Sequence, residues 1–167
     1  MDSKCLDFQA GVESALTWLV PALAGSGTLY GAGIIDNAMT FSPAKVLLDA
    51  ETIRQVGRVL DGIQVNDNTI ALDVIKKVGP RGSFLGEKHT VKNYRKEYSP
   101  VELFDRRSYG AWEKDGCKDA YERATEKAKY IIENHKPTPL APEIIKGIDD
   151  ILEEACEEKG LKGWDKK

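Results

Sequence analysis

The run Thr28-Leu29-Tyr30-Gly31-Ala32-Gly33 is the clearest strand signal in the 167-residue chain. It is a short β-prone segment that passes into glycines, and a helix is predicted on each side of it, over residues 8–23 and 43–60. A helix–strand–loop–helix order is typical of one unit of a repeating β/α structure. Because an isolated strand leaves its backbone N–H and C=O groups without partners, we expect residues 29–33 to pair with strands outside this sequence.

Helix patterns dominate the rest of the chain. Asp67 is expected to cap a third helix that ends at Gly79-Pro80, and residues 80–110 are expected to form loops and short turns. Two further helices, separated by prolines, precede a polar tail from Gly160 to Lys167. In the helix at residues 8–23 the apolar residues at helical spacing are Phe8, Val12, Ala15, Leu16 and Leu19. In the last helix of the chain they are Ile144, Ile145, Ile148, Ile151, Leu152 and Ala155.

Two interpretations of the fold remain open on this pattern. One is a small, mostly helical domain with a single irregular extended segment, and the pattern alone favours it. The other is a part of an α/β barrel. A complete (β/α) barrel takes roughly 250 residues, so 167 residues hold only a part of one.

Composition excludes several classes of protein. Hydrophobic residues make up 41% of the chain and charged residues 31%, and the net charge of -3 does not call for a nucleic-acid partner. No apolar stretch is long enough for a transmembrane helix, and the acidic start is unlike a secretory signal. Cys5, Cys117 and Cys156 are odd in number and far apart, so we expect reduced thiols in a cytoplasmic protein, with no disulfide framework and no metal site.

The glycine-rich segment at residues 30–33 matches neither a dinucleotide fingerprint nor a phosphate loop. A functional interpretation places it in a loop at the C-terminal end of a barrel strand, where barrel enzymes carry their active sites. Asp36, beside Tyr30, would then hold a cationic amine by charge and by attraction to the ring face. The alternative, which these residues alone favour, is a tight turn with a solvated aspartate.

Three other features suggest a site or a structural contact. Gln9 and Glu13 are four residues apart and share a helical face, although Glu13 would equally complement the helix dipole. His89 is a candidate proton shuttle, but a structural hydrogen bond or a helix cap is the commoner role of a lone histidine. Asp105-Arg106-Arg107 is expected to form an ion pair in a packed junction, and Trp112 is expected in the core.

A locally positive stretch begins near the end of the third predicted helix and continues beyond it. Its basic residues are at positions 76, 77, 81, 88, 92, 95 and 96. Such a stretch suits an acidic protein partner, whereas a solvated face is the simpler interpretation.

Taken in order, many short segments resemble the trimethylamine:corrinoid methyltransferases, and they cover almost the whole chain. They are Asp2-Ser3-Lys4, Leu6-Asp7, Gln9-Ala10-Gly11, Glu13, Leu29-Tyr30-Gly31-Ala32-Gly33, Phe41, Asp49-x-Glu51, Gly62-Ile63-x-Val65, Leu72-Asp73-x-Ile75, Val78-Gly79-Pro80, Phe84-Leu85, His89-Thr90, Asp105-Arg106-Arg107, Trp112 and Asp119-x-x-x-Arg123-Ala124. Each segment is a weak signal alone, and their combination is specific.

The resemblance implies a fold and a reaction. The fold is α/β: the chain would be the helix-rich C-terminal part of a (β/α)8 TIM barrel, with residues 1–110 as its last units and residues 111–167 as C-terminal helices. The enzyme, a homo-oligomer at full length, would transfer a methyl group from a small methylamine to the Co(I) centre of a separate corrinoid protein, as in methanogenesis. Pyrrolysine would lie just before Asp2, so we expect an amber codon upstream of codon 1 and an inactive isolated chain.

The same resemblance suggests which residues serve the reaction. Gln9 and Glu13 would lie beside the pyrrolysine imine as catalytic groups, and Tyr30 and Asp36 would line the amine pocket. His89 would contact the residues that line this substrate pocket. No cofactor would bind this chain directly. Two rivals remain: a pyrrolysine-free methyltransferase for quaternary amines such as glycine betaine, and a non-catalytic helical interaction module.

Overall fold

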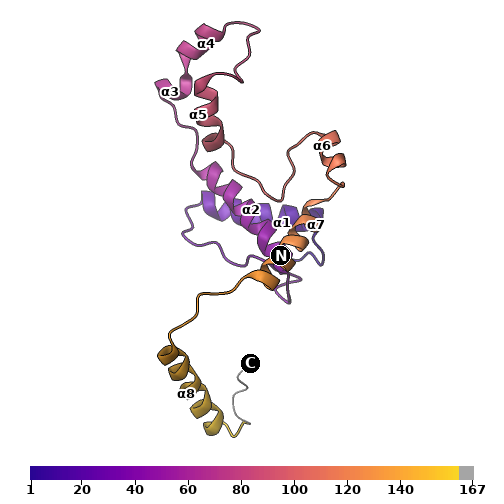
Figure 1. Cartoon of the computed structure of the whole chain (residues 1–167), viewed down its shortest axis with the longest axis vertical. Coiled ribbons are helices and arrows are strands. Elements are labelled where there is room, and N and C mark those ends of the chain that lie inside the picture. The colour runs from indigo at the N-terminus through magenta and orange to yellow at the C-terminus, as the bar shows by residue number, and fades with distance from the viewer. Residues whose placement is uncertain (162–167) are drawn as a thin grey trace. The chain divides into compact units, whose positions relative to one another are not determined.

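The computed structural model describes residues 1–161, which form helices with little strand (Figure 1). The chain divides into two compact units, Met1–Glu133 and Asn134–Lys167. The polar tail expected from Gly160 lies mostly outside the described residues. The division expected near residue 110 stays a prediction.

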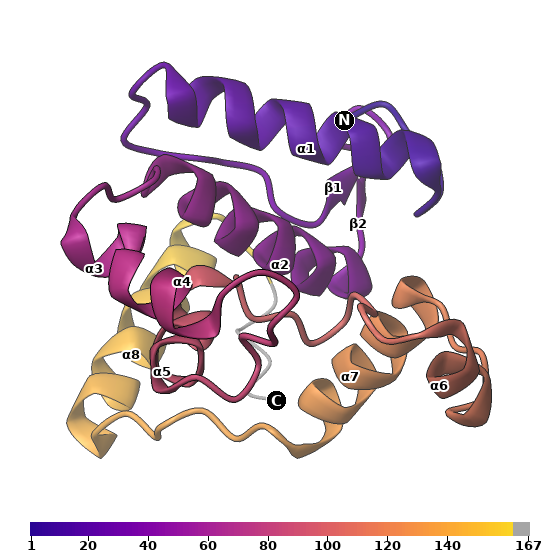
Figure 2. The same cartoon turned by 90° about the horizontal axis from the view of Figure 1, so that it is seen from above.

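Two helices of the first unit, α1 (Phe8–Leu23) and α2 (Pro43–Leu60), lie side by side (Figure 2). Asp7 caps α1 by accepting a hydrogen bond from the Ala10 amide, and Ser42 caps α2 in the same way from Lys45. Trp18 packs with Ala22 and with Val56 of α2 in a buried cluster. Both predicted helices are therefore confirmed.

The buried face of α1 is not the one with the most apolar residues. Ala10, Ser14, Trp18 and Ala22 are buried, while Phe8 is 86% exposed. Of the five apolar residues at helical spacing, Leu19 alone packs against the buried cluster with Trp18. Trp18 fills this face against Val56 of α2, and Ser14 on the same face reaches polar partners on α2.

The strand predicted at residues 28–33 is wrong. The strands are β1 (Ile34–Ile35) and β2 (Thr40–Phe41), which pair with each other antiparallel, Ile34 opposite Phe41 and Ile35 opposite Thr40. Gly31 and Gly33 have φ of 95° and 82°, which bends the preceding backbone out of the extended conformation. Within residues 1–161 this hairpin is the only sheet, and the expectation that residues 29–33 pair with strands outside this sequence stays a prediction.

Short helices follow α2. The predicted third helix is split at Ala71, whose φ is 51°, into α3 (Asp67–Ile70) and α4 (Leu72–Val78). Its cap is Asn66 and not Asp67, because Asn66 and Thr69 exchange side-chain-to-backbone hydrogen bonds in a capping box. Residues 80–110, predicted as loops and turns, include α5 (Lys88–Glu97) and the start of α6 (Tyr109–Lys114).

A second buried cluster joins the start of α2 to α7 (Ala120–Asn134). It contains Ala44, Leu103 and Ala124, with Leu6 and Phe104 packed against it. The cluster holds the irregular segment at residues 101–105 between the two helices. The start of α2 and the segment before α1 are thereby fixed at this end of the unit.

In the second unit, α8 (Pro142–Glu158) begins with Pro142 in its first turn. The helix and its apolar stripe agree with the prediction, yet none of its residues is buried. Among the described residues, no helix is both long and apolar enough to cross a membrane.

Candidate functional site

The carboxylate of Glu13 gathers three donors at the start of α1. Gln9 Nε2 donates to Oε1 over 2.6 Å, and the backbone amides of Asp2 and Ser3 donate to Oε2 over 2.8 Å and 3.1 Å. The predicted pairing of Gln9 with Glu13 is therefore present. In addition, Glu13 fixes the segment before the helix.

These hydrogen bonds keep Glu13 ionised. The hydrogen bond from Gln9 lowers the pKa of the Glu13 carboxyl most, and that from the Ser3 amide comes next. A carboxylate with a lowered pKa is a poor proton acceptor near neutral pH. Glu13 is suited to hold or stabilise positive charge.

Asp36 reaches the same segment from the hairpin. Its backbone amide donates to the Ser3 carbonyl over 2.9 Å, and its carboxylate lies 3.8 Å from Lys4 Nζ. Asp36 has a φ of 52°, as the tight-turn interpretation predicts. Ser3 is thus held on one side by Glu13 and on the other by Asp36, so the structure brings together Gln9, Glu13 and Asp36.

Tyr30 and His89 are placed differently. The Tyr30 side chain is 86% exposed and does not line an enclosed amine pocket in this structure. His89 lies on α5, where its Nε2 is 2.6 Å from the carbonyl oxygen of Asn68 beside a pocket of about 340 Å³. This contact is of the structural kind considered for a lone histidine. The functional roles of both residues stay predictions.

A buried polar network directly behind Glu13 was not predicted. Lys45 Nζ lies 2.7 Å from each carboxylate oxygen of Asp49 and donates to Ser14 Oγ over 2.9 Å. Ser14 in turn donates to Asp49 over 2.9 Å, and the Gly33 amide donates to Asp49 over 2.8 Å. The i,i+4 spacing of Lys45 and Asp49 was a local signal for the ion pair, but nothing local indicated Ser14 or Gly33.

This network connects α1 and the hairpin, which carry Glu13 and Asp36, to α2. Ser14 is adjacent to Glu13 on α1, Gly33 precedes the hairpin that carries Asp36, and the ion pair belongs to α2. Every donor of the Lys45 ammonium group is used, so a buried charge pair is accommodated by close geometry. Ser14 and Asp49 also line a cavity of about 180 Å³ with Ala10, Phe104 and Tyr121.

Glu51 makes a second buried polar contact, which the sequence analysis did not predict. Its fully buried carboxylate accepts from the backbone amides of Glu102, Leu103 and Phe104 over 3.0, 2.9 and 2.7 Å. A carboxylate that accepts several amides fixes the backbone it faces. The segment Asp49-x-Glu51 therefore anchors both the hairpin and residues 102–104 to α2.

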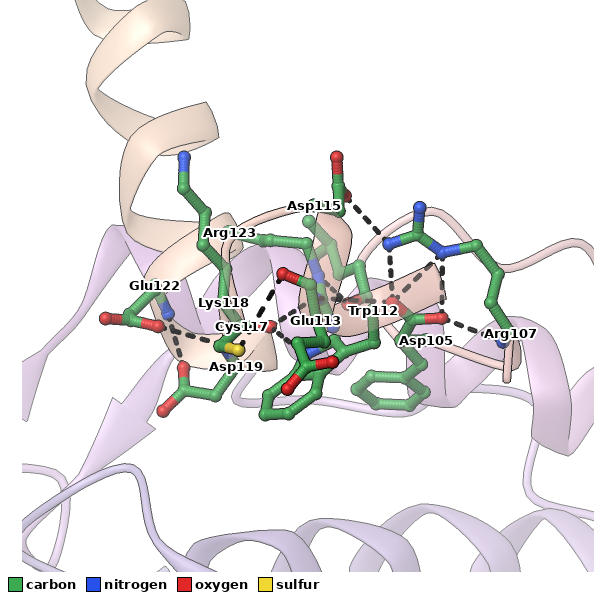
Figure 3. Close-up of polar contacts among 12 residues, drawn as sticks. Asp105, Arg107, Trp112, Glu113, Asp115, Cys117, Lys118, Asp119, Glu122 and Arg123 are labelled. Atoms are coloured by element: carbon green, nitrogen blue, oxygen red, sulfur yellow. Dashed lines mark hydrogen bonds and ion pairs between the residues drawn. The ribbon is translucent and has the colours of Figure 1, made fainter. Parts of the chain in front are cut away.

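The expected ion pair in the Asp105-Arg106-Arg107 segment is confirmed (Figure 3). Arg107 Nη2 lies 2.6 Å from Asp105 and 2.8 Å from Asp115, and Arg123 Nε donates to the Leu103 carbonyl over 2.6 Å. The Arg107 hydrogen bond holds the pKa of Asp105 at about 2. Trp112, expected in the core, is half-buried instead, because its indole N–H donates to the Lys118 carbonyl. Arg107 is half exposed and Asp115 more so, so the ion pair lies at the surface and not in a packed junction.

The three cysteines are free thiols, as expected. A hydrogen bond to Asp7 raises the pKa of the exposed Cys5 thiol. Within residues 1–161, His, Cys, Asp and Glu side chains form no group of three that could hold a metal ion.

Comparison with known proteins gives consistent matches. The family model described as trimethylamine methyltransferase (MTTB) matches residues 1–160. A trimethylamine methyltransferase MttB of Desulfitobacterium hafniense is 41% identical over 161 residues, which are 96% of this chain and 32% of that protein. MttB2 of Methanosarcina mazei is 40% identical over 154 residues, 92% of this chain and 31% of that protein.

A differently named relative also matches. A glycine betaine methyltransferase of Desulfitobacterium hafniense is 38% identical over 144 residues, 86% of this chain and 30% of that protein. The chain spans about a third of the length of these curated relatives.

Proposed function

Because this chain belongs to the trimethylamine methyltransferase (MTTB) family, we propose that it serves the transfer of a methyl group from trimethylamine, or a related methylamine, to the Co(I) centre of a cognate corrinoid protein. The observation that supports this proposal most is the family match over residues 1–160. The corrinoid protein is the methyl acceptor and a separate partner.

The chemistry requires a positively charged amine nitrogen. A neutral tertiary amine would have to leave as an amide anion, so the nitrogen must be made cationic before Co(I) attacks the methyl carbon. The enzyme then mainly positions the reactants and stabilises charge. In our proposal the ionised Glu13 supports that positive charge, Gln9 orients the Glu13 carboxylate, and Asp36 with Tyr30 receives the amine.

The barrel fold is also part of our proposal. We propose that residues 1–161 form a helix-rich part of a (β/α)8 barrel, and that the exposed apolar side of α1, with Phe8, Val12 and Leu16, packs on other parts of the barrel. A structure of a longer chain of this family would test it.

Pyrrolysine just ahead of Asp2 is also part of the proposal, and the nucleotide sequence upstream of codon 1 tests it.

A second candidate function has support of its own. The match to a glycine betaine methyltransferase favours a quaternary amine, whose nitrogen is cationic without any imine. The carboxylates of Glu13 and Asp36 would suit either substrate, since both present a positive nitrogen. The residue that aligns with pyrrolysine separates the two.

The test is methyl transfer to a purified corrinoid protein in its Co(I) state, followed by absorbance. A chain extended upstream of codon 1 is compared with the 167-residue chain, and trimethylamine with glycine betaine. Glu13→Gln, which removes the charge and keeps an acceptor, should lower the rate at least about tenfold if Glu13 stabilises developing charge. Glu113→Gln on the exposed surface of α6 (Tyr109–Lys114) is the matched control and should leave the rate unchanged. A folded extended chain that transfers methyl from neither amine would refute the proposal.

A further inference from the structure

The Asp49 carboxylate binds two segments that are far apart in the sequence. Its Oδ1 accepts a hydrogen bond from the Ser14 hydroxyl of α1 over 2.9 Å, and its Oδ2 accepts one from the Gly33 amide over 2.8 Å. Ser14 directly follows Glu13 in α1, and Gly33 comes shortly before Asp36. One buried side chain of α2 therefore links the parts of the chain that carry the two carboxylates we assign to the amine.

The connection from Gly33 to Asp36 is short and held in place. Ile34 and Ile35, which separate the two residues, pair with β2, and Ile35 is buried. The Gly33 carbonyl accepts a hydrogen bond from the Ser42 amide over 2.9 Å, so Gly33 is bound through its carbonyl as well as its amide. A displacement of the Gly33 amide is therefore transmitted to the turn that carries Asp36.

The other end of this link, α1, has a separate attachment to α2. Trp18 packs with Val56 in a buried cluster, and this contact does not involve the Asp49 carboxylate. Loss of that carboxylate is therefore expected to displace the hairpin more than α1. In our proposal Asp36 receives the amine and Glu13 supports charge during transfer, so a displaced hairpin should weaken amine binding more than it slows the transfer itself.

We propose, resting on the function proposed above, that Asp49 is a positioning residue of the amine site. Its carboxylate fixes the Gly33 amide and thereby sets the place of Asp36 relative to Glu13. The Asp49 side chain is 2% exposed, so it acts through Gly33 and not by contact with the amine. Because a misplacement of about 1 Å can cost about 100-fold in catalytic efficiency, the loss of this one hydrogen bond should be measurable.

The ion pair of Asp49 with Lys45 allows the hydrogen bond to be tested apart from the charge. In Lys45→Met/Asp49→Leu, apolar side chains of similar size replace both buried charges, a change that folded proteins often tolerate, and the Gly33 amide loses its acceptor. In Lys45→Met/Asp49→Asn the charges are absent too, but the asparagine oxygen can accept from Gly33 and its amide group can donate to Ser14. The two variants differ at position 49 alone, in whether an acceptor faces Gly33.

Hydrogen exchange of backbone amides in the 167-residue chain tests the link without any reaction. The amides of Gly33 and Asp36 should exchange about tenfold faster in the leucine variant than in the asparagine variant, because one hydrogen bond is lost. Glu51→Ala is the matched control, since Glu51 is an equally buried carboxylate of α2 that binds residues 102–104 and not the hairpin. It should leave Gly33 and Asp36 protected. Faster exchange of Gly33 without any change at Asp36 would overturn the proposal.

Methyl transfer by the chain extended upstream of codon 1 tests the consequence for the amine. For the amine that the unaltered chain uses, KM should rise about tenfold in the leucine variant and stay within about threefold in the asparagine variant, while kcat changes less than about threefold in both. Glu51→Ala should leave KM unchanged. Equal KM values for the two double variants would overturn the role of Asp49 and leave the proposed function standing. An unaltered extended chain that transfers no methyl group would overturn both.

Discussion

Lys45 Nζ lies 2.7 Å from both carboxylate oxygens of Asp49, one turn further along α2, and both side chains are almost fully buried. The ion pair is extended by Ser14 from α1 and by the Gly33 amide before the hairpin. A buried pair of this kind contributes little net stability compared with apolar side chains, but the loss of one partner is costly. The network therefore sets the arrangement of α1, α2 and the hairpin.

Lys45→Met is expected to lower the free energy of unfolding by about 3–5 kcal/mol, because Asp49 would remain as a buried charge without its partner. Urea unfolding followed by circular dichroism measures it. The control is Lys4→Met, which removes an exposed lysine 3.8 Å from Asp36 and should change stability by less than about 1 kcal/mol. Equal stability of the Lys45 and Lys4 variants would contradict the importance of the buried pair.

Glu51→Ala is expected to destabilise the chain by at least about 2 kcal/mol, because three backbone amides lose their acceptor. Hydrogen exchange gives the sharper measurement, since the amides of Glu102, Leu103 and Phe104 should all exchange faster. Glu113→Ala on the exposed surface of α6 is the control. Unchanged protection of these three amides would show that Glu51 does not hold this segment.

The helices could be predicted from the sequence because their signals are local. Ser42 before Pro43 and Asp7 before the first helix are caps that act within a few residues, and both are present in the structure. The pairing of Gln9 with Glu13 followed from i,i+4 spacing in the same way. Local rules of this kind need no knowledge of the rest of the chain.

The face that α1 buries could not be predicted, because its cause is distant in sequence. Ser14 faces inward to meet Lys45 and Asp49, which lie 31 and 35 residues away. Phe8 is consequently on the outside, although hydrophobicity alone would bury it. The approach of Asp36 to Ser3 is equally non-local, and so was the error at residues 28–33, where the bend at Gly33 replaces an extended strand.

Ionisation of the Asp105 carboxyl is expected to make the stability of the folded chain depend on pH. Arg107 lowers the pKa of this carboxyl from 3.8 to about 2. Because the folded-state pKa lies below the unfolded one, the stabilisation is present above pH 4 and is lost as the pH falls toward 2. The melting temperature of Asp105→Asn should be lower than that of the unaltered chain at pH 6, and the two should converge near pH 2. Asp150→Asn on α8 is the control, and a constant difference for Asp105→Asn across this range would contradict the linkage.

Gly33 and Gly57 give opposite expectations for the same substitution by alanine. At Gly33 the φ is 82°, and an added Cβ would overlap a methyl group of Val46 and lie 2.8 Å from the Phe41 ring. At Gly57, inside α2, an added Cβ would meet nothing within 4 Å. Gly57→Ala should therefore stabilise the chain by about 0.5–1 kcal/mol through helix propensity, whereas Gly33→Ala should destabilise it by roughly 2 kcal/mol or more. Parallel urea unfolding of both variants measures the difference. A Gly33 variant as stable as the Gly57 variant would mean that the close approach of β2 and α2 to Gly33 does not exist in solution.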